Sequence, residues 1–318
     1  MRMPPLGVFL LSLCFGVWGC NKTSGQAPKA AHITFYSGYA SGVGGKVYGR
    51  VSKGPPDAAP KPGESIIKRV EETLLELDAR ALHHAQVEVQ VGGQTMTVQS
   101  DARGFLEFAL PQNLPPPAVS LQIRLRQPGY EASPVATHLP VFDNEPGLAL
   151  ISDVDDTLLD SQVTDKTKLA ANAIVRSTWE LETFDEAPQT LSRFAHDKPV
   201  FYLSGSPWGF HDRIRSFFER MGFPKGTLVL KRFSAEPLLD QMAFKYPHLK
   251  ELFAALPKRR FLLFGDSGEK DPEIYARLRL ENPTQVADIY IHHITKEPAD
   301  SPRFSGMKVF NSWAALRP

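Results

Sequence analysis

The alternation of apolar and polar residues divides the chain into two parts with different secondary structure. Residues 30–143 carry short β-type segments and one helical pattern, over residues 65–82, where apolar residues recur at helical spacing. The predicted strands are residues 32–36, 46–51, 85–91, 94–100, 105–110 and 121–125. The pair Gly92-Gly93 between two of them predicts a tight hairpin turn. We therefore predict a small β-sandwich-like domain with one helix over residues 30–143.

Strands alternate with helices from residue 144 to residue 318. The predicted strands are residues 148–152, 199–203, 227–230, 261–264 and 287–291. The predicted helices lie near residues 165–177, 187–196, 208–221, 245–256 and 271–279. This order is typical of βαβ units, in which helices connect parallel strands. We therefore predict the α/β fold class for the chain, with a Rossmann-like parallel sheet in its carboxyl-terminal part.

Composition adds little to this division into two domains. The chain has 318 residues, of which 42% are hydrophobic and 22% charged, as in ordinary globular proteins with about two domains. The formal net charge is +1, so the charge balance does not indicate a nucleic-acid partner.

The first 19 residues predict a targeting segment. Arg2 supplies a positive charge, and residues 8–15 form an apolar stretch that is too short to span a membrane as a stable helix. The segment ends at Gly19, directly before Cys20. This arrangement resembles a bacterial lipoprotein signal, in which a small residue precedes the cysteine that becomes lipidated.

Cleavage before Cys20 would remove Cys14 and leave a single cysteine, which cannot form an internal disulfide. Lipid attachment to Cys20 accounts for this residue, and residues 20–29 form a flexible tether. We therefore predict a membrane-anchored lipoprotein of a bacterial envelope. The residue after Cys20 is Asn21 and not an aspartate. By resemblance to bacterial sorting patterns, this favours the outer membrane. The alternative is a periplasmic or secreted protein with one free thiol.

Three carboxylates directly follow the first predicted strand of the second part. The apolar run 148–151 reads as a buried parallel strand, and Asp153, Asp155 and Asp156 follow where the crevice of such a sheet opens. Asp153 and Asp155 are two residues apart, so an extended chain places them on one face. Close carboxylates need a cation or a shared proton, and carboxylate oxygens suit Mg²⁺. An acidic solvated turn is the alternative for this motif alone.

Three further groups follow other strands or open a helix. Ser204 and the backbone amides at Gly205 follow the second strand and can hold phosphoryl oxygens. Lys245 opens a helix and can neutralise a phosphate as a point charge. Asp266 follows the fourth strand and can complete a metal site, and Asp271 can orient a metal-bound water or the lysine. Their common placement at strand ends points to phosphate chemistry.

These motifs resemble those of the haloacid dehalogenase superfamily of phosphatases. The matching residues are Asp153-Val154-Asp155-Asp156-Thr157, Ser204, Lys245 and Gly265-Asp266 with Asp271. More narrowly, the segments YLSGSPW (202–208), GFPKGTLVL (222–230), FKYPHLKELFAALP (244–257) and FLLFGDSGEKDPEIY (261–275) are similar to the catalytic-domain family named for the fungal actin-patch phosphatidate phosphatase. The similarity covers about residues 145–295, and is weaker in ITFYSGYAS and VYGRV near the amino end.

The resemblance implies a two-step mechanism with a covalent aspartyl-phosphate. Asp153 would attack phosphorus, and Asp155 would protonate the leaving oxygen and then take a proton from the hydrolytic water. Mg²⁺ would be held by the Asp153 carboxylate, the Asp155 carbonyl and Asp266. Ser204 and Lys245 would hold the phosphoryl oxygens, with the remaining motif residues, Thr157 and Asp271, in supporting positions.

The substrate predicted from this resemblance is phosphatidate or a related lipid phosphate. Residues 158–186 are too few for a large cap between the first two motifs, and a small cap leaves a site open to bulky phosphates. Two alternatives remain open: a phosphatase of a phosphoprotein or sugar phosphate, and a catalytically inactive surface-anchored binding protein. The intact acids at each motif argue against the inactive protein.

Overall fold

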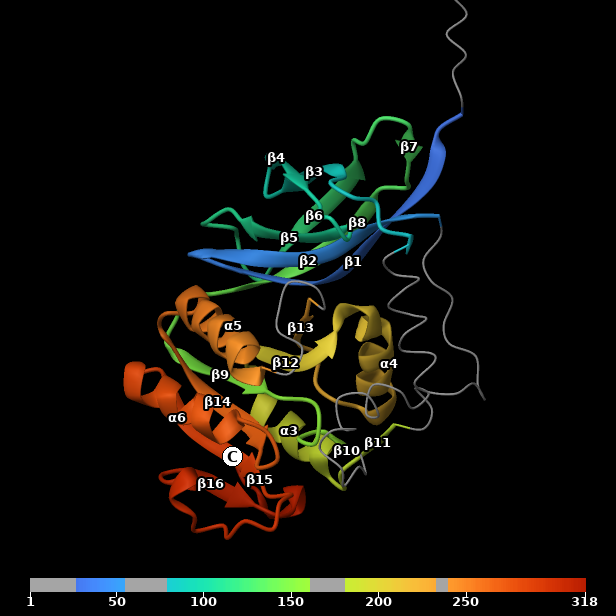
Figure 1. Ribbon diagram of the computed structural model, residues 1–318. Helices are drawn as coiled ribbons and strands as arrows, with labels where there is room; N and C mark the ends of the chain where they lie inside the picture. The colour runs from blue at the N-terminus through green and yellow to red at the C-terminus, as the bar shows by residue number, and fades with distance from the viewer. Residues whose placement is uncertain (1–26, 55–78, 161–180, 233–239) are drawn as a thin grey trace, which may run out of the picture.

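The computed structural model describes residues 27–54, 79–160, 181–232 and 240–318, in which strands are the dominant element (Figure 1). Strands make up 42% of the described residues, and four α-helices accompany them. The predicted α/β class with a Rossmann-like parallel sheet and a small cap is therefore wrong for the chain. Two of the predicted helices, at 65–82 and 165–177, and the lipidation site Cys20 fall wholly or largely outside the described residues.

The amino-terminal part is one mixed sheet of eight strands. Its strands are β1 (Lys29–Ser41), β2 (Gly44–Lys53), β3 (Gln86–Val91), β4 (Gln94–Gln99), β5 (Phe105–Leu110), β6 (Ala118–Leu125), β7 (Tyr130–Glu131) and β8 (Val135–Phe142). Their order is β4-β3-β6-β8-β1-β2-β5, and β7 pairs with β1. β1 runs parallel to β7 and β8, whereas the other neighbours are antiparallel.

This sheet curls until its end strands β4 and β5 approach each other, so it is nearly closed and barrel-like (Figure 1). The predicted β-sandwich-like domain of two packed sheets is therefore corrected to a single curled sheet. Alternating valines of β3, buried at 0–1% exposure, fill the interior. The predicted turn at Gly92-Gly93 joins β3 to β4 with φ values of 54° and 78°, which glycine adopts without steric cost.

The carboxyl-terminal part contains a six-stranded parallel sheet. Its strands are β9 (Gly147–Ser152), β12 (Val200–Pro207), β13 (Thr227–Lys231), β14 (Arg259–Asp266), β15 (Val286–His292) and β16 (Lys308–Phe310), in the order β13-β12-β9-β14-β15-β16. Its helices are α3 (Ala187–Ala195), α4 (His211–Met221), α5 (Gln241–Ala255) and α6 (Asp271–Glu281). Short elements complete it: β10 (Leu159–Asp160), β11 (Glu182–Thr183), η2 (Trp208–Phe210), η3 (Pro302–Phe304) and η4 (Trp313–Ala315).

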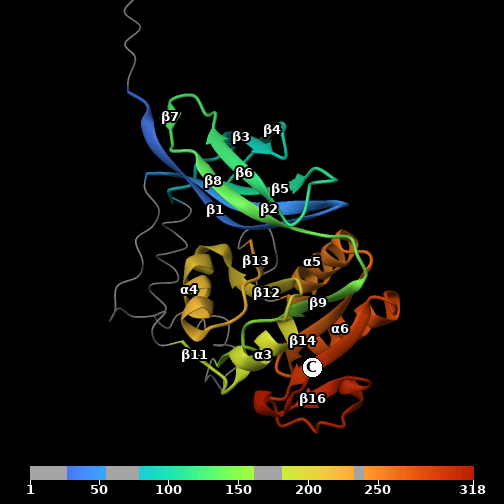
Figure 2. The same ribbon diagram turned by 180° about the vertical axis from the view of Figure 1, so that it is seen from behind.

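The curled sheet lies over the parallel sheet, with β1 and β2 on the side that faces it (Figure 2). Aromatic side chains of β1 and β2 join the apolar core of the parallel sheet. The Trp208 ring, at 2% exposure, is stacked between Tyr36 and Tyr48, with ring centroids at 5.3 Å and 4.9 Å. Tyr39 meets Phe201 of β12 edge-on at 5.5 Å. These contacts make one continuous apolar core across the two sheets, which fixes the strand that carries the candidate phosphate-binding turn.

Among the described residues, no helix combines the length and the apolar character that a membrane crossing requires.

Candidate active site

The central strand β9 delivers Asp153 to the carboxyl end of the parallel sheet. Residues 149–151 are fully buried, because β9 lies between β12 and β14. The backbone N–H of Asp153 donates to the Phe264 carbonyl of β14 at 2.9 Å. The Thr157 hydroxyl donates to Asp153 Oδ2 at 3.0 Å, so the turn that follows the strand also fixes the carboxylate. Asp153 is only 1% exposed.

Asp266 reaches the same place because β14 is the parallel neighbour of β9. Ser152 and Phe264 pair in register, so Asp153 and Asp266 both leave the sheet at this edge. The Asp266 carboxylate oxygen Oδ1 accepts hydrogen bonds from the backbone N–H groups of Gly268 at 2.5 Å and Glu269 at 3.0 Å. The loop after β14 thus closes around this aspartate, which is fully buried.

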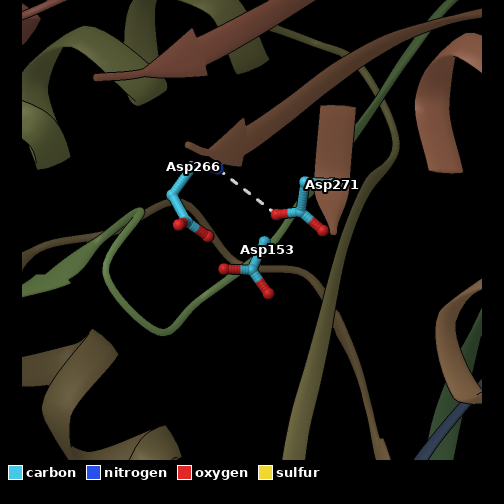
Figure 3. Close-up of side chains that lie close together, drawn as sticks. All are labelled: Asp153, Asp266 and Asp271. Carbon is cyan, nitrogen blue, oxygen red and sulfur yellow. Dashed lines mark hydrogen bonds between the residues drawn. The ribbon is translucent and has the colours of Figure 1, made fainter. Parts of the chain in front are cut away.

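Asp271, the first residue of α6, is the third member of this acidic group. Its Oδ2 accepts a hydrogen bond from the Asp266 backbone N–H at 3.2 Å. A Cβ atom at Gly265 would lie 2.5–2.8 Å from the Asp271 carboxyl group, so this close approach requires glycine. Figure 3 shows the side chains of Asp153, Asp266 and Asp271 turned toward one another, and one oxygen from each lies within 4.8 Å of the others.

These three aspartates fit a divalent cation. Asp266 Oδ2 is buried and accepts no hydrogen bond from the residues that the structure describes, and the buried Asp153 Oδ1 has no hydrogen bond there but forms an ion pair with Lys245 at 2.7 Å. Burial raises the pKa of both carboxyl groups, and the neighbouring Asp271 carboxylate raises them further. Unsatisfied buried carboxylate oxygens are costly, and they are the ligand type that hard divalent cations prefer. The residues present therefore fit a metal cofactor.

The acidic group adds a candidate ligand to those predicted by sequence. The predicted set was Asp153, Asp155 and Asp266, with Asp155 acting through its backbone carbonyl, and this role of the carbonyl stays a prediction. The group of side chains contains Asp271 beside Asp153 and Asp266, whereas the Asp155 side chain faces Ser204. Asp271 was predicted only as a supporting residue.

Lys245 of α5 is surrounded by three carboxylates, although it is only 1% exposed. Its Nζ is 2.7 Å from Asp153 Oδ1, 2.7 Å from Asp271 Oδ1 and 3.0 Å from Glu269 Oε2. Burial alone lowers the pKa of a lysine, but the three carboxylates outweigh it and hold the pKa of Lys245 well above its ordinary value. The ammonium therefore stays charged beside the acidic group.

Ser204 of β12 binds Asp155, the second carboxylate of the first motif. Its hydroxyl donates to Asp155 Oδ2 at 2.6 Å, and the Ser206 hydroxyl approaches the same oxygen at 3.3 Å. Burial raises the pKa of Asp155, and the hydrogen bond from Ser204 offsets part of this effect. Asp155 thus stands beside Asp153 on the β12 side, whereas Asp266 stands on the β14 side.

Gly205 lies between these serines in β12, next to the Gln241 side chain. A Cβ atom there would lie 2.9 Å from both terminal amide atoms of Gln241, so this side chain would have to shift. The Gln241 Nε2 in turn donates to Glu269 Oε1 at 3.1 Å. Gln241 therefore links the turn at Gly205 to the acidic loop after β14.

Comparison with known sequences agrees with this geometry. Residues 148–293 match the family described as "Phosphatidate phosphatase APP1, catalytic domain". The resemblance to this phosphatase family is thereby confirmed. The matched segment holds each motif residue predicted for the site, from Asp153 to Asp271.

Two curated relatives are fungal proteins. Phosphatidate phosphatase APP1 of Saccharomyces cerevisiae is 28% identical over 211 residues, which are 64% of this chain and 35% of the yeast protein. An uncharacterized protein of Schizosaccharomyces pombe is 24% identical over 166 residues, 51% of this chain and 27% of that protein. The chain thus spans about a third of the length of the relatives that it matches.

Solved structures resemble the chain only weakly. A chain of the Pnkp1/Rnl/Hen1 complex is 15% identical with a TM-score of 0.34, covering 50% of this chain and 54% of that one. The structure of PhoD is 8% identical with a TM-score of 0.27, covering 82% and 70%. Scores at this level carry no argument about the fold.

Sequence reasoning missed two residues of the site, Glu269 and Gln241. Glu269 lies inside the segment GDSGEKD that carries Asp266 and Asp271, so an acid at this place was visible in the sequence. Its contact with Lys245 was not, because the two residues belong to different elements. Gln241 precedes Lys245 by one helical turn on α5, and the i, i+4 spacing that places both on one helix face is its only sequence signal.

Proposed function

We propose that this protein is a Mg²⁺-dependent phosphomonoesterase that acts on phosphatidate or a related lipid phosphate through an aspartyl-phosphate. One observation carries the proposal: Asp153, Asp266 and Asp271 converge within 4.8 Å beside the buried Lys245. Asp155 stands two residues from Asp153 with a separate hydrogen-bond partner. A nucleophile and a proton shuttle must be different groups, and the two aspartates occupy different surroundings.

The chemistry assigns a role to each side chain. An oxygen of Asp153 forms a bond to phosphorus while the ester P–O bond breaks, and Asp155 gives its proton to the departing alkoxide. Asp155 then takes a proton from a water that attacks the aspartyl-phosphate, which releases inorganic phosphate and restores Asp153. Ser204 and Lys245 hold phosphoryl oxygens during both steps. Asp153, Asp266 and Asp271 would hold Mg²⁺, which supplies charge stabilisation to the transferring group.

A lipid phosphate is the substrate class that we favour over a phosphoprotein or a sugar phosphate. The yeast relative is named a phosphatidate phosphatase, and its similarity to this chain extends beyond the catalytic segment. The short connection between the first two motifs, residues 158–186, leaves little chain for a large cap over the site. A site without a large cover admits a phosphate that remains embedded in a lipid surface.

Substitution of the two aspartates tests the mechanism. Asp153→Asn should abolish hydrolysis and prevent a covalent phospho-enzyme. Asp155→Asn should lose about 10²–10⁴-fold on phosphatidate, which has a poor leaving group, and less on an activated aryl phosphate. Phospho-enzyme trapping with acid quench and mass spectrometry would detect the intermediate that accumulates in Asp155→Asn. Asp288→Asn, on the exposed part of β15, is the control and should retain full activity.

Three outcomes would contradict this proposal. Equal losses on both substrates in Asp155→Asn, without a trapped intermediate, would remove the proton-shuttle role. Full hydrolysis of water-soluble phosphates with none of phosphatidate in mixed micelles would favour the non-lipid substrate class. An absence of hydrolysis by the unmodified protein would favour a binding protein.

We further propose that the protein is anchored to a bacterial envelope membrane, most simply the outer membrane, through a lipid on Cys20. The sequence of the first 20 residues supports this proposal. Cys20→Ser should abolish metabolic labelling with an acyl probe and release the protein into the soluble fraction. An unlabelled, soluble unmodified protein would instead indicate a periplasmic or secreted protein.

A further inference from the structure

Three carboxylates surround the ammonium group of Lys245. A lysine ammonium carries three N–H donors. Its Nζ donates to Asp271 at 2.7 Å and to Glu269 at 3.0 Å, and it forms an ion pair with Asp153 Oδ1 at 2.7 Å. A phosphoryl oxygen that binds Lys245 must therefore compete with carboxylates that already contact it.

Exposure identifies the carboxylate that can leave. The side chains of Asp153 and Asp271 are 1% and 0% exposed, so both are held inside the buried acidic group. The Glu269 side chain is 29% exposed and so lies at the accessible side of the lysine. Only Glu269 can be replaced at Lys245 without disturbing the buried acidic group.

Glu269 is also held in a defined place next to the phosphate-binding turn. Its Oε1 accepts the hydrogen bond from Gln241 Nε2 at 3.1 Å, while its Oε2 contacts Lys245. The same Gln241 amide lies against Gly205, where a Cβ atom would be 2.9 Å from it. The carboxylate of Glu269 thus lies between Lys245 and the turn that would bind the phosphoryl oxygens.

We propose that Glu269 occupies the position of a phosphoryl oxygen at Lys245 and competes with the phosphate group of the substrate and with inorganic phosphate. This inference rests on the proposed phosphatase function. A carboxylate and a phosphoryl oxygen carry like charge and compete for the same donor, so Glu269 weakens phosphate binding. Product phosphate leaves more readily for the same reason, and Glu269 becomes a residue that sets affinity and release.

Calorimetric titration of the full chain with inorganic phosphate, at saturating Mg²⁺, tests the inference without turnover. Glu269→Gln keeps the shape but removes the charge and one of the two acceptor oxygens, and should lower the Kd for phosphate by about fivefold, as expected for a partly exposed ion pair. Gln241→Met releases Glu269 from its second partner and should shift the Kd in the same direction by less. Glu281→Gln, an equal charge change on the exposed face of α6, should leave the Kd unchanged.

The results separate this inference from the proposed function. If the unmodified protein binds phosphate and hydrolyses esters, but Glu269→Gln binds phosphate equally well or more weakly, then Glu269 positions Lys245 and the competition is refuted. If the unmodified protein neither binds phosphate nor hydrolyses esters, the proposed function fails and this inference fails with it. Circular dichroism and thermal unfolding of each variant verify that the fold is retained.

Discussion

The substitution Asp266→Asn should make the metal-free protein more stable while it removes stabilisation by Mg²⁺. Asp266 Oδ1 accepts two backbone hydrogen bonds, which an asparagine oxygen would keep. Asp266 Oδ2 accepts no hydrogen bond within the described part of the chain and faces the carboxylates of Asp153 and Asp271. An amide NH₂ group in this position would donate to those carboxylates instead of repelling them.

The magnitude follows from the separation of the acids. At the 4.8 Å limit that bounds the three ligand oxygens, two carboxylates repel by about 3–4 kcal/mol at an effective dielectric constant of about 20. Partial protonation relieves much of this repulsion, because burial and the neighbouring acids raise the pKa of Asp266. We therefore expect Asp266→Asn to raise the free energy of unfolding by about 1–3 kcal/mol without metal. A gain of this size is typical when a substitution relieves unfavourable interactions in a functional site.

Thermal unfolding with EDTA and with Mg²⁺ measures both effects. Mg²⁺ at a hundred times its Kd should stabilise the unmodified protein by about 2.7 kcal/mol, or about 5–10 °C in Tm. Asp266→Asn should show a higher Tm than the unmodified protein in EDTA and little response to Mg²⁺. A lower Tm in EDTA, or an unchanged response to Mg²⁺, would refute the reasoning that these acids repel and share a cation. Asp288→Asn is the control, with changes within about 0.5 kcal/mol.

Two further predictions concern the contact between the sheets. Trp208→Ala should destabilise the protein by about 3–5 kcal/mol in urea unfolding, because the ring is fully buried between Tyr36 and Tyr48; a loss below about 1 kcal/mol would contradict this packing. Glu251→Gln should cost about 1 kcal/mol at pH 7, because His248 and Lys46 lower the pKa of Glu251 to about 2. The folded pKa lies below the ordinary 4.5, so this difference should decline as pH falls from about 4.5 toward 2; a constant difference would contradict it.

The parts of the site that one segment determines could be predicted from the sequence. An apolar run that ends in acids marks a buried strand and its polar end, and β9 followed by Asp153 has this form. The same reasoning placed Asp266 at the end of β14 and Ser204 near the end of β12. The pattern of a few consecutive residues was sufficient to predict these strand ends. A buried central strand is encoded by a local apolar run, which the sequence shows directly.

Contacts between distant segments could not be predicted in this way. β8 was missed, because Pro140 and the polar residues Thr137 and His138 interrupt its apolar pattern, and its parallel pairing with β1 joins the two halves of the curled sheet. β1 was predicted to end near residue 36, but it continues through Gly38. A Cβ atom at Gly38 would lie 2.9 Å from the Leu139 side chain, so this glycine reflects close packing rather than a strand end.

The packing of the two sheets gives the amino-terminal sheet a direct connection to the site. Trp208 directly follows β12, so the ring that packs against Tyr36 and Tyr48 lies at the end of the strand that orients Ser204 toward Asp155. β1 also reaches the next strand, because the Ser37 hydroxyl accepts a hydrogen bond from the Leu228 backbone N–H of β13 at 3.1 Å. A rigid support of this kind matters for catalysis, since small displacements of a positioning group cost rate. We therefore expect that separating the curled sheet from the parallel sheet would expose an apolar face and loosen the segment that the proposed chemistry needs.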